Sequence, residues 1–160
     1  MPDCLRITSQ SADETHDIGR AIGAAAQPGD LFLLTGPLGA GKTCLTQGIA
    51  WGLGVKERPR SPTFVLLARY RGRVNIHHAD LFRIEGTADA LSLGLDDCLN
   101  DEDVCIVEWA DRAPELFVEP SLRVAMDHHP DQNNTRTITL RTDHSRYRPI
   151  LQALAARKRP

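Results

Sequence analysis

Cysteine is scarce in this 160-residue chain, and its four copies are scattered along the sequence. Cys4, Cys44, Cys98 and Cys105 show no C-x-x-C spacing, which argues against a zinc knuckle and against a redox pair. No apolar run approaches the roughly 18 residues of a membrane span, and the first residues lack the charged-then-apolar pattern of a signal peptide. We therefore expect a cytoplasmic protein with no membrane partner.

An excess of charge of one sign is also absent. The formal net charge is -2, and charged residues make up 25% of the chain. This near neutrality argues against a generally basic surface that coats nucleic acid. Basic residues cluster only in the last five residues, "ARKRP". We expect residues 157–160 to form a loose basic tail and residues 1–156 to form a single domain.

Strand and helix patterns alternate along the chain without an internal repeat. Ser11 stands three residues before Glu14, the spacing of a capping box at the start of a helix. We expect two β-hairpins on one side of the sheet, and strands and helices that together form an α/β fold with a mixed parallel and antiparallel sheet flanked by helices. The expected hairpins span 64–80 and 122–141, and the other strands 5–9, 31–36 and 104–108. The expected helices span 11–26, 43–54, 87–93 and 145–157, with a helical turn near 111–117.

A glycine-rich stretch, "GPLGAGKT", follows the apolar run "LFLLT" and precedes a helical pattern. It matches the phosphate-binding pattern G-x-x-x-x-G-K-[ST] without a mismatch. In such loops the glycines let backbone N–H groups turn toward phosphate, the lysine reaches the β- and γ-phosphates, and the final hydroxyl holds Mg²⁺. We therefore predict a P-loop site for a nucleoside triphosphate and Mg²⁺, made by Gly36, Pro37, Leu38, Gly39, Ala40, Gly41, Lys42, Thr43 and the adjoining Cys44.

Two acidic residues end apolar strands downstream of this loop. Asp80 ends "VNIHHAD", and Glu108 ends "VCIVE". A carboxylate at the end of a buried strand is costly unless it has a partner. Either residue could ligate Mg²⁺ directly or through water, and Glu108 could also orient or deprotonate the attacking water. Lys42, Asp80 and Glu108 are therefore the catalytic candidates, and Thr43, Asp80 and Glu108 the metal candidates, with simple pairing to an arginine as the alternative for either carboxylate.

Three other classes of protein were weighed. No N-K-x-D motif is present, which argues against a GTPase, and the chain is short for a motor ATPase. A small-molecule kinase would fit the length, and Arg69, Arg71 and Arg73 could form its lid, although surface charges on a hairpin explain them as well.

The adjacent His77 and His78 point to opposite faces of a strand, so they cannot both ligate one ion.

Several blocks resemble one family closely. "GDLFLLTGPLGAGKTCLTQGIAWGLG", "SPTFVLLARY", "HHADLFRI", "SLGLDDCL" and "VCIVEWADR" occur in the order and spacing of the TsaE (YjeE) family. The resemblance extends from about residue 5 to residue 141. It implies a bacterial P-loop ATPase needed to make threonylcarbamoyladenosine in tRNA. Two positions depart from the family pattern, because Cys44 replaces a common second threonine and Ala110 a common proline.

The resemblance also implies roles for residues outside the P-loop. Thr63, in the "SPT" block, is placed to sense the γ-phosphate, and Trp109 is an aromatic beside the nucleotide and near the partner surface. Asp80 corresponds to the acidic residue of the H-x-D-L block, and Glu108 to a metal-facing glutamate. Three further residues correspond to family positions near the adenine or in the last hairpin: Ser11, Thr15 and Arg136.

The function that the resemblance implies is an ATP-hydrolysing, Mg²⁺-dependent switch subunit acting on the TsaB–TsaD pair, with tRNA as an indirect partner. ATP would order residues 58–63 through its γ-phosphate. Turnover by the isolated protein should be slow, because only Arg83 and Arg112 are candidates for an arginine finger in the chain itself. A small-molecule kinase and a non-catalytic, nucleotide-gated adaptor are the alternatives.

Overall fold

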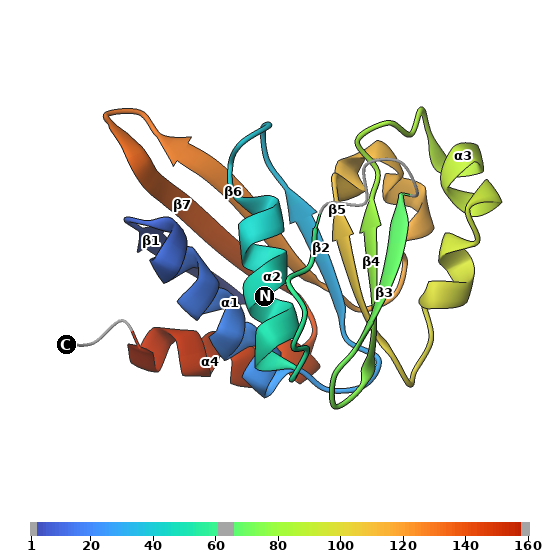
Figure 1. Ribbon diagram of the computed structural model, residues 1–160, viewed down its shortest axis with the longest axis horizontal. Coiled ribbons are helices and arrows are strands. Elements are labelled where there is room, and N and C mark those ends of the chain that lie inside the picture. Colours follow the sequence, from blue (N-terminus) through green and yellow to red (C-terminus); the bar gives the residue numbers. More distant parts are fainter. Residues whose placement is uncertain (1–2, 61–65, 158–160) are drawn as a thin grey trace.

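The computed structural model describes residues 3–60 and 66–157, which form one seven-stranded sheet and the helices around it (Figure 1). Its strands are β1 (Asp3–Ser9), β2 (Leu31–Thr35), β3 (Leu67–Arg71), β4 (Asn75–Asp80), β5 (Val104–Glu108), β6 (Leu122–His129) and β7 (Gln132–Thr142). The α-helices are α1 (Ala12–Ala25), α2 (Lys42–Gly52), α3 (Thr87–Ser92) and α4 (Arg148–Arg157). Short 3₁₀ turns are η1 (Leu95–Cys98), η2 (Ala110–Arg112), η3 (Pro114–Leu116) and η4 (Ser145–Tyr147).

The sheet is mixed, as the sequence predicts, and its strand order is β1-β7-β6-β2-β5-β4-β3. β2 runs parallel to both β5 and β6, and β4 runs parallel to β5. The apolar run of β2 is buried on both faces, which suits the centre of a parallel sheet. The expectation that both hairpins lie on one side was wrong. The β3–β4 and β6–β7 hairpins flank the parallel strands from opposite sides, and β1 then pairs with β7.

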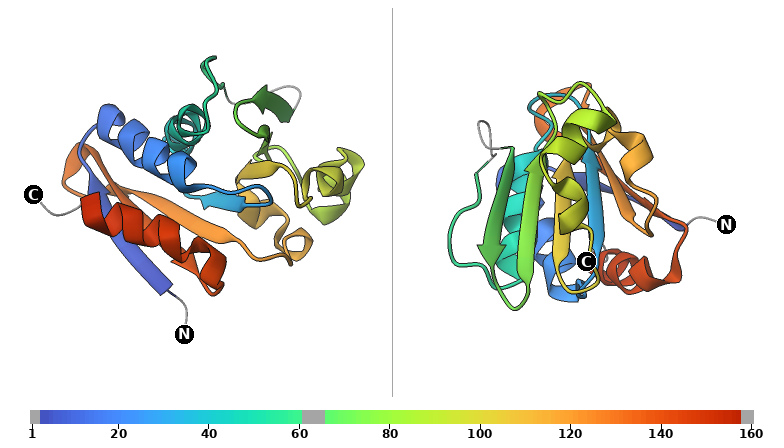
Figure 2. Two further views of the ribbon diagram at one scale, coloured as in Figure 1. Left: turned by 90° about the horizontal axis from the view of Figure 1, so that it is seen from below. Right: turned by 90° about the vertical axis from the view of Figure 1, so that its right-hand side faces the viewer.

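Helices cover the two faces of the sheet unequally (Figure 2). α1, α2 and α4 enclose the larger apolar cluster, in which Ile22, Ile49 and Leu151 pack near the β2 residue Phe32. On the other face, α3 and the turns η1 to η3 cover β2, β5 and β4 around a smaller cluster that includes Leu33. Outward-facing residues of β6 and β7 remain accessible on this second face, because these strands alternate buried and exposed positions.

The helix α1 begins as the sequence predicts. The side chain of Ser11 accepts a hydrogen bond from the backbone N–H of Glu14 at 3.1 Å, and the Glu14 carboxylate accepts one from Gln10 N–H at 2.6 Å. These contacts satisfy backbone donors that a helix start leaves unpaired.

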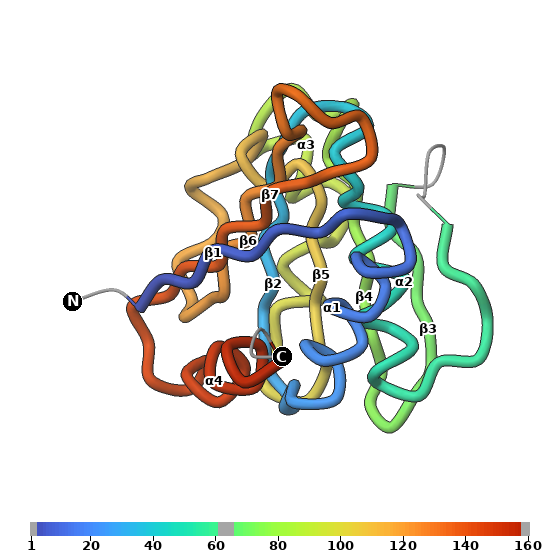
Figure 3. Tube along the Cα trace, turned by 90° about the vertical axis from the view of Figure 1, so that its left-hand side faces the viewer, coloured from blue at the N-terminus to red at the C-terminus, as the bar shows by residue number. Residues whose placement is uncertain are grey.

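The helices α1 and α2 lie side by side (Figures 1 and 3), and glycines form their contact. A Cβ added to Gly48 would lie 2.4 Å from the carbonyl oxygen of His16, and one added to Gly23 would lie 2.1 Å from that of Ile49. Only hydrogen at these positions permits such an approach. This contact was not among the features predicted from the sequence.

Three boundaries differ from the predicted ones. The second hairpin is tighter than expected, since β6 and β7 leave only residues 130–131 between them. Arg157, which we placed in a loose tail, is the last residue of α4, and its guanidinium donates to the Asp17 carbonyl at 2.9 Å. The expected helical turn near 111–117 is the pair of short turns η2 and η3. Within residues 3–60 and 66–157, no helix is long and apolar enough to cross a membrane.

Candidate active site

The glycine-rich loop connects the end of β2 to the start of α2. Gly36 has φ +143°, and a Cβ there would lie 2.2 Å from the carbonyl oxygen of Met126 in β6. Gly39 and Gly41 also have positive φ, at +78° and +101°, a backbone conformation that residues other than glycine rarely adopt. The loop is therefore held against the sheet in a conformation that depends on its glycines, and it ends where the N-terminus of α2 offers unpaired N–H groups to an anion.

Lys42, the motif lysine, is buried and bends back over its own loop. Its ammonium donates to the carbonyl oxygens of Gly36 and Pro37 at 2.6 and 2.9 Å, and it lies 4.2 Å from the centre of the Trp109 ring. Burial lowers the pKa of Lys42, while the negative charges of Glu108, and to a smaller extent Asp80, act to raise it. A cation that is only partly compensated in this way favours an anionic ligand.

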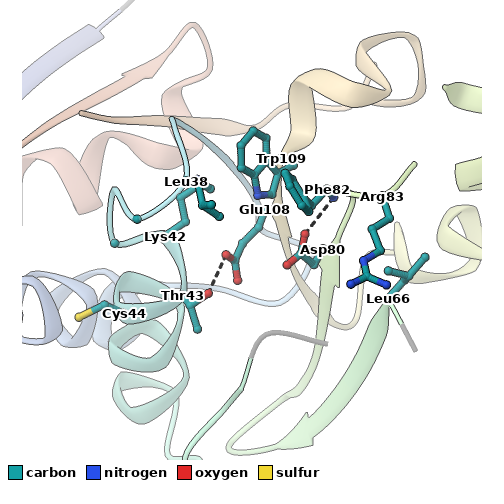
Figure 4. A pocket seen from close by; sticks show the side chains of 12 residues that line it. Leu38, Lys42, Thr43, Cys44, Leu66, Asp80, Phe82, Arg83, Glu108 and Trp109 are labelled. Carbon is teal, nitrogen blue, oxygen red and sulfur yellow. Dashed lines mark hydrogen bonds between the residues drawn. The ribbon is translucent and has the colours of Figure 1, made fainter. Parts of the chain in front are cut away.

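Both carboxylate oxygens of Glu108 have partners, and these contacts offset the free energy that burying a carboxylate at the end of a strand costs. The Thr43 hydroxyl donates to Oε1 at 2.9 Å, and His78 Nε2 lies 2.5 Å from Oε2. The side chain of Glu108 is 3% exposed and that of His78 is fully buried. Two donors, one from α2 and one from β4, thus aim this carboxylate at the start of α2. Figure 4 shows the contact with Thr43. The alternative that Glu108 merely pairs with an arginine finds no support in these contacts.

Asp80 lies directly beside Glu108, since the two are register partners on the parallel strands β4 and β5. Its Oδ1 accepts a hydrogen bond from Phe82 N–H at 2.9 Å, and its carboxylate faces the same space as that of Glu108 (Figure 4). A threonine hydroxyl and two carboxylates are hard oxygen donors of the kind that Mg²⁺ prefers. The donor set of Thr43, Asp80 and Glu108 therefore fits the metal that the sequence predicts.

An aromatic wall closes one side of this site. Trp109 has φ +57°, which turns the chain sharply at the end of β5, and its ring centre lies 4.9 Å from that of Phe82. The guanidinium carbon of Arg112 lies 5.4 Å from the Trp109 ring centre. The resulting cavity measures about 420 Å³, and its walls include the P-loop, both carboxylates, Trp109 and Arg83.

The β6–β7 hairpin reaches the P-loop from the other side. Arg136 Nη2 donates to the Gly39 carbonyl at 3.3 Å, and His128 Nε2 lies 3.4 Å from the Leu38 carbonyl oxygen. Arg136, which only the family resemblance singled out, is therefore in contact with the loop.

Ser11 and Thr15 serve the start of α1. Thr15 Oγ1 lies 2.7 Å from the Ser9 hydroxyl and donates to the Ser11 carbonyl at 3.2 Å. Neither residue lines the cavity. The start of α1 is nonetheless close to it, since the thiol of Cys44, which lines the cavity, donates to the Ala12 carbonyl at 3.4 Å. The adenine role of Ser11 and Thr15 stays a prediction. Thr63 lies outside the described residues.

Two residues of this site were not predicted from the sequence. His78 was considered only as a metal ligand, although it stands two positions before Asp80 on one strand and must face the same side. That spacing was a usable signal. Phe82 carried no such signal, because it follows the end of β4 and its position depends on how the chain turns toward Trp109.

Fold and site together define an α/β protein in which a Walker A sequence joins a parallel strand to a helix and two strand-end carboxylates face that helix. A family model described as threonylcarbamoyl adenosine biosynthesis protein TsaE matches residues 9–138. The chain belongs to the TsaE family, whose role is in the biosynthesis of threonylcarbamoyladenosine in tRNA.

Individual relatives agree over most of their length. The chain is 40% identical to a tRNA threonylcarbamoyladenosine biosynthesis protein TsaE of Treponema pallidum, over 77% of this chain and 94% of that one. It is 34% identical to the protein of that name from Bacillus subtilis, over 94% of both chains. The crystal structure of Bacillus subtilis YdiB superimposes with a TM-score of 0.82 at 31% identity, covering 99% of this chain and 98% of that one.

Proposed function

We propose that this chain is a Mg²⁺-dependent ATPase that acts as a nucleotide switch on the TsaB–TsaD pair and touches tRNA only indirectly. The observation that carries the proposal is the position of Glu108, whose carboxylate is held between Thr43 and His78 at the start of the P-loop helix. A buried carboxylate fixed by two donors beside a phosphate-binding loop is suited to orienting a water or a metal.

Each residue has a distinct part in this mechanism. The loop N–H groups and the N-terminus of α2 bind the phosphates, and Lys42 exchanges its bonds to the Gly36 and Pro37 carbonyls for phosphate oxygens. Thr43, Asp80 and Glu108 would hold Mg²⁺, which when bound would neutralise charge on the transferred phosphoryl group. Glu108 also orients the attacking water and accepts its proton, and Trp109 with Phe82 keeps bulk water from one side of the site.

A dependence on partners follows from the arginines near the site. The guanidinium carbon of Arg112 lies 5.7 and 5.4 Å from the ring centres of Phe82 and Trp109. Its guanidinium therefore stacks on these rings rather than serving as an arginine finger. Arg83 lines the cavity and is the remaining candidate within the chain. The isolated protein is expected to turn over slowly, and a partner that repositions Arg83 or supplies another cation would raise the rate.

The kinase alternative loses one of its supports. Arg73 donates to the carbonyls of Gly23 and Ala26 at 2.8 and 2.6 Å, where it caps the end of α1. A guanidinium engaged in this way is not available to close over a transferred phosphate, and a lid would need Arg69 and Arg71 alone.

The direct test is ATP hydrolysis by the purified protein, alone and with the TsaB–TsaD pair. We expect turnover to rise at least about tenfold with the pair, and Lys42→Ala to abolish it. Release of ADP that instead needs a metabolite and no protein would favour a kinase. Binding of Mg²⁺-ATP without any stimulation by the pair would favour a non-catalytic adaptor.

The two adjacent histidines provide a matched pair of variants. His78 contacts Glu108, whereas His77 Nε2 lies 2.7 Å from Asp103 Oδ2, near the opposite end of β5. We expect His78→Leu to lower kcat for ATP hydrolysis roughly tenfold, because Glu108 loses the donor that orients it. His77→Leu should leave kcat within about twofold, although both variants remove a buried histidine–carboxylate contact. Equal losses of kcat in the two variants would mean that His78 acts only through stability.

A further inference from the structure

A groove lies on the second face of the sheet, between the turns η2 and η3 and the strands β6 and β7. It consists of two hollows, of about 460 and 340 Å³, which share the residues Phe117, Arg123 and Arg141. Apolar side chains line much of the larger hollow: Leu33, Ala110, Pro114, Phe117 and Ala125. Val118, at the smaller hollow, is 83% exposed. Leu33, Ala110 and Phe117 are themselves buried, so the accessible apolar surface of the groove lies at Pro114, Ala125 and Val118. An accessible apolar surface is common where another molecule binds.

Two arginines stand at the junction of the hollows. Arg123 on β6 and Arg141 on β7 are direct cross-strand partners, and both are exposed. Neither makes an ion pair or a hydrogen bond through its side chain with any other residue in 3–60 or 66–157. Like charges directly opposite each other weaken a strand pair. By contrast, Arg146 pairs with Asp30 at 2.9 Å and Arg148 with Asp3 at 2.6 Å.

We propose that this groove binds a segment of a partner protein in which one or two carboxylates stand among apolar side chains. A carboxylate between Arg123 and Arg141 would accept paired hydrogen bonds from guanidinium groups and would relieve their repulsion. The apolar residues that flank the segment's carboxylate would then cover the exposed Pro114 and Ala125.

The lining favours such a segment over nucleic acid. Asp111 lines the larger hollow, and Glu119 and Asp143 line the smaller one. A phosphodiester backbone carries a charge at every nucleotide, so these acidic groups would repel it along its whole length. A segment with a single carboxylate at the arginine pair would meet less repulsion. A phosphate backbone also gains little from contact with the apolar Pro114 and Ala125.

The groove adjoins the candidate active site through the sheet. Ala110 and Asp111 in its wall follow Trp109, and Thr35 in its floor precedes Gly36. A segment bound there would contact the ends of β2 and β5 from the face opposite α2. The TsaB–TsaD pair is the partner to test, and this choice rests on the proposed function.

The experiment measures binding of the full-length protein to the TsaB–TsaD pair in Mg²⁺-ATP. Arg123→Glu/Arg141→Glu should raise the Kd at least about tenfold. Arg123→Gln/Arg141→Gln should also raise the Kd, and it tests the same contact should the charge reversal perturb folding. Arg69→Glu/Arg71→Glu makes the same charge change on β3, outside the groove, and should bind as the wild type does. A fluorescent ATP analogue reports whether each variant keeps its nucleotide site.

Outcomes of this experiment separate the groove from the ATPase proposal. Unchanged binding of both groove variants, or no binding by the wild type, overturns the groove proposal. Equal weakening by the β3 control also overturns it, because net charge would then explain the effect. Loss of binding to a 12-nucleotide oligouridine, with binding to the pair intact, would assign the groove to nucleic acid instead. Arginine-dependent binding without stimulated hydrolysis supports the groove and contradicts the ATPase switch.

Discussion

Replacing Glu108 by glutamine is expected to lower ATP hydrolysis at least about 100-fold and to leave the affinity for ATP nearly unchanged. In the protein, the Thr43 hydroxyl donates to Glu108 Oε1 at 2.9 Å. Glutamine has the shape of glutamate, and its carbonyl oxygen can still accept this hydrogen bond. It cannot take a proton from water, although its carbonyl oxygen can still face a metal. The largest loss should therefore appear in kcat rather than in nucleotide binding.

The measurement is single-turnover hydrolysis of ATP in the presence of the TsaB–TsaD pair, with nucleotide affinity measured separately. Glu102→Gln is a matched control, because Glu102 is exposed just before β5, at the end of that strand opposite Glu108. Retained hydrolysis in Glu108→Gln would rule out Glu108 as the base. An unchanged yield of modified tRNA, despite lost hydrolysis, would show that nucleotide binding alone is the signal.

The parts of the site that the sequence predicts are those in which neighbouring residues carry the chemistry. The P-loop is one continuous stretch, so its residue types and its position between a strand and a helix predict a phosphate site directly. Asp80 and Glu108 end apolar runs, and parallel pairing of β4 with β5 brings such ends together. The strand patterns therefore indicated that each carboxylate ends a strand, whereas their adjacency depends on the pairing of β4 with β5.

Contacts between distant segments were harder to predict. The partner of Glu108 depends on the register of β4 against β5, which places His78 beside Ile106 and turns its ring toward the end of β5. Nothing in the pattern of either hairpin indicates whether it lies on the same side of the parallel strands as the other, because that depends on the connections through α2 and η2. Sequence patterns predict local pairing better than strand order.

The contact between α1 and α2 is the clearest case, since helix propensity predicts the opposite of what the structure implies. Glycine inside a helix costs about 1 kcal/mol relative to alanine, so propensity alone predicts that Gly48→Ala stabilises the protein. Gly48 faces the His16 carbonyl oxygen, and a Cβ there would also lie 2.9 Å from the Gly19 Cα. Both atoms belong to backbone and cannot turn away, so the helices would have to separate.

We expect Gly48→Ala to lower the free energy of unfolding by about 2 kcal/mol, a typical cost of overpacking, and Tm by roughly 4–8 °C. Gly86→Ala is the control, because no atom lies within 4 Å of a Cβ at that position. Denaturant and thermal unfolding of both variants make the comparison. Because α2 carries Lys42 and Thr43, separation of the helices should also weaken nucleotide binding in Gly48→Ala but not in Gly86→Ala. A stability equal to or above that of the wild type would mean that α1 and α2 do not pack through these glycines.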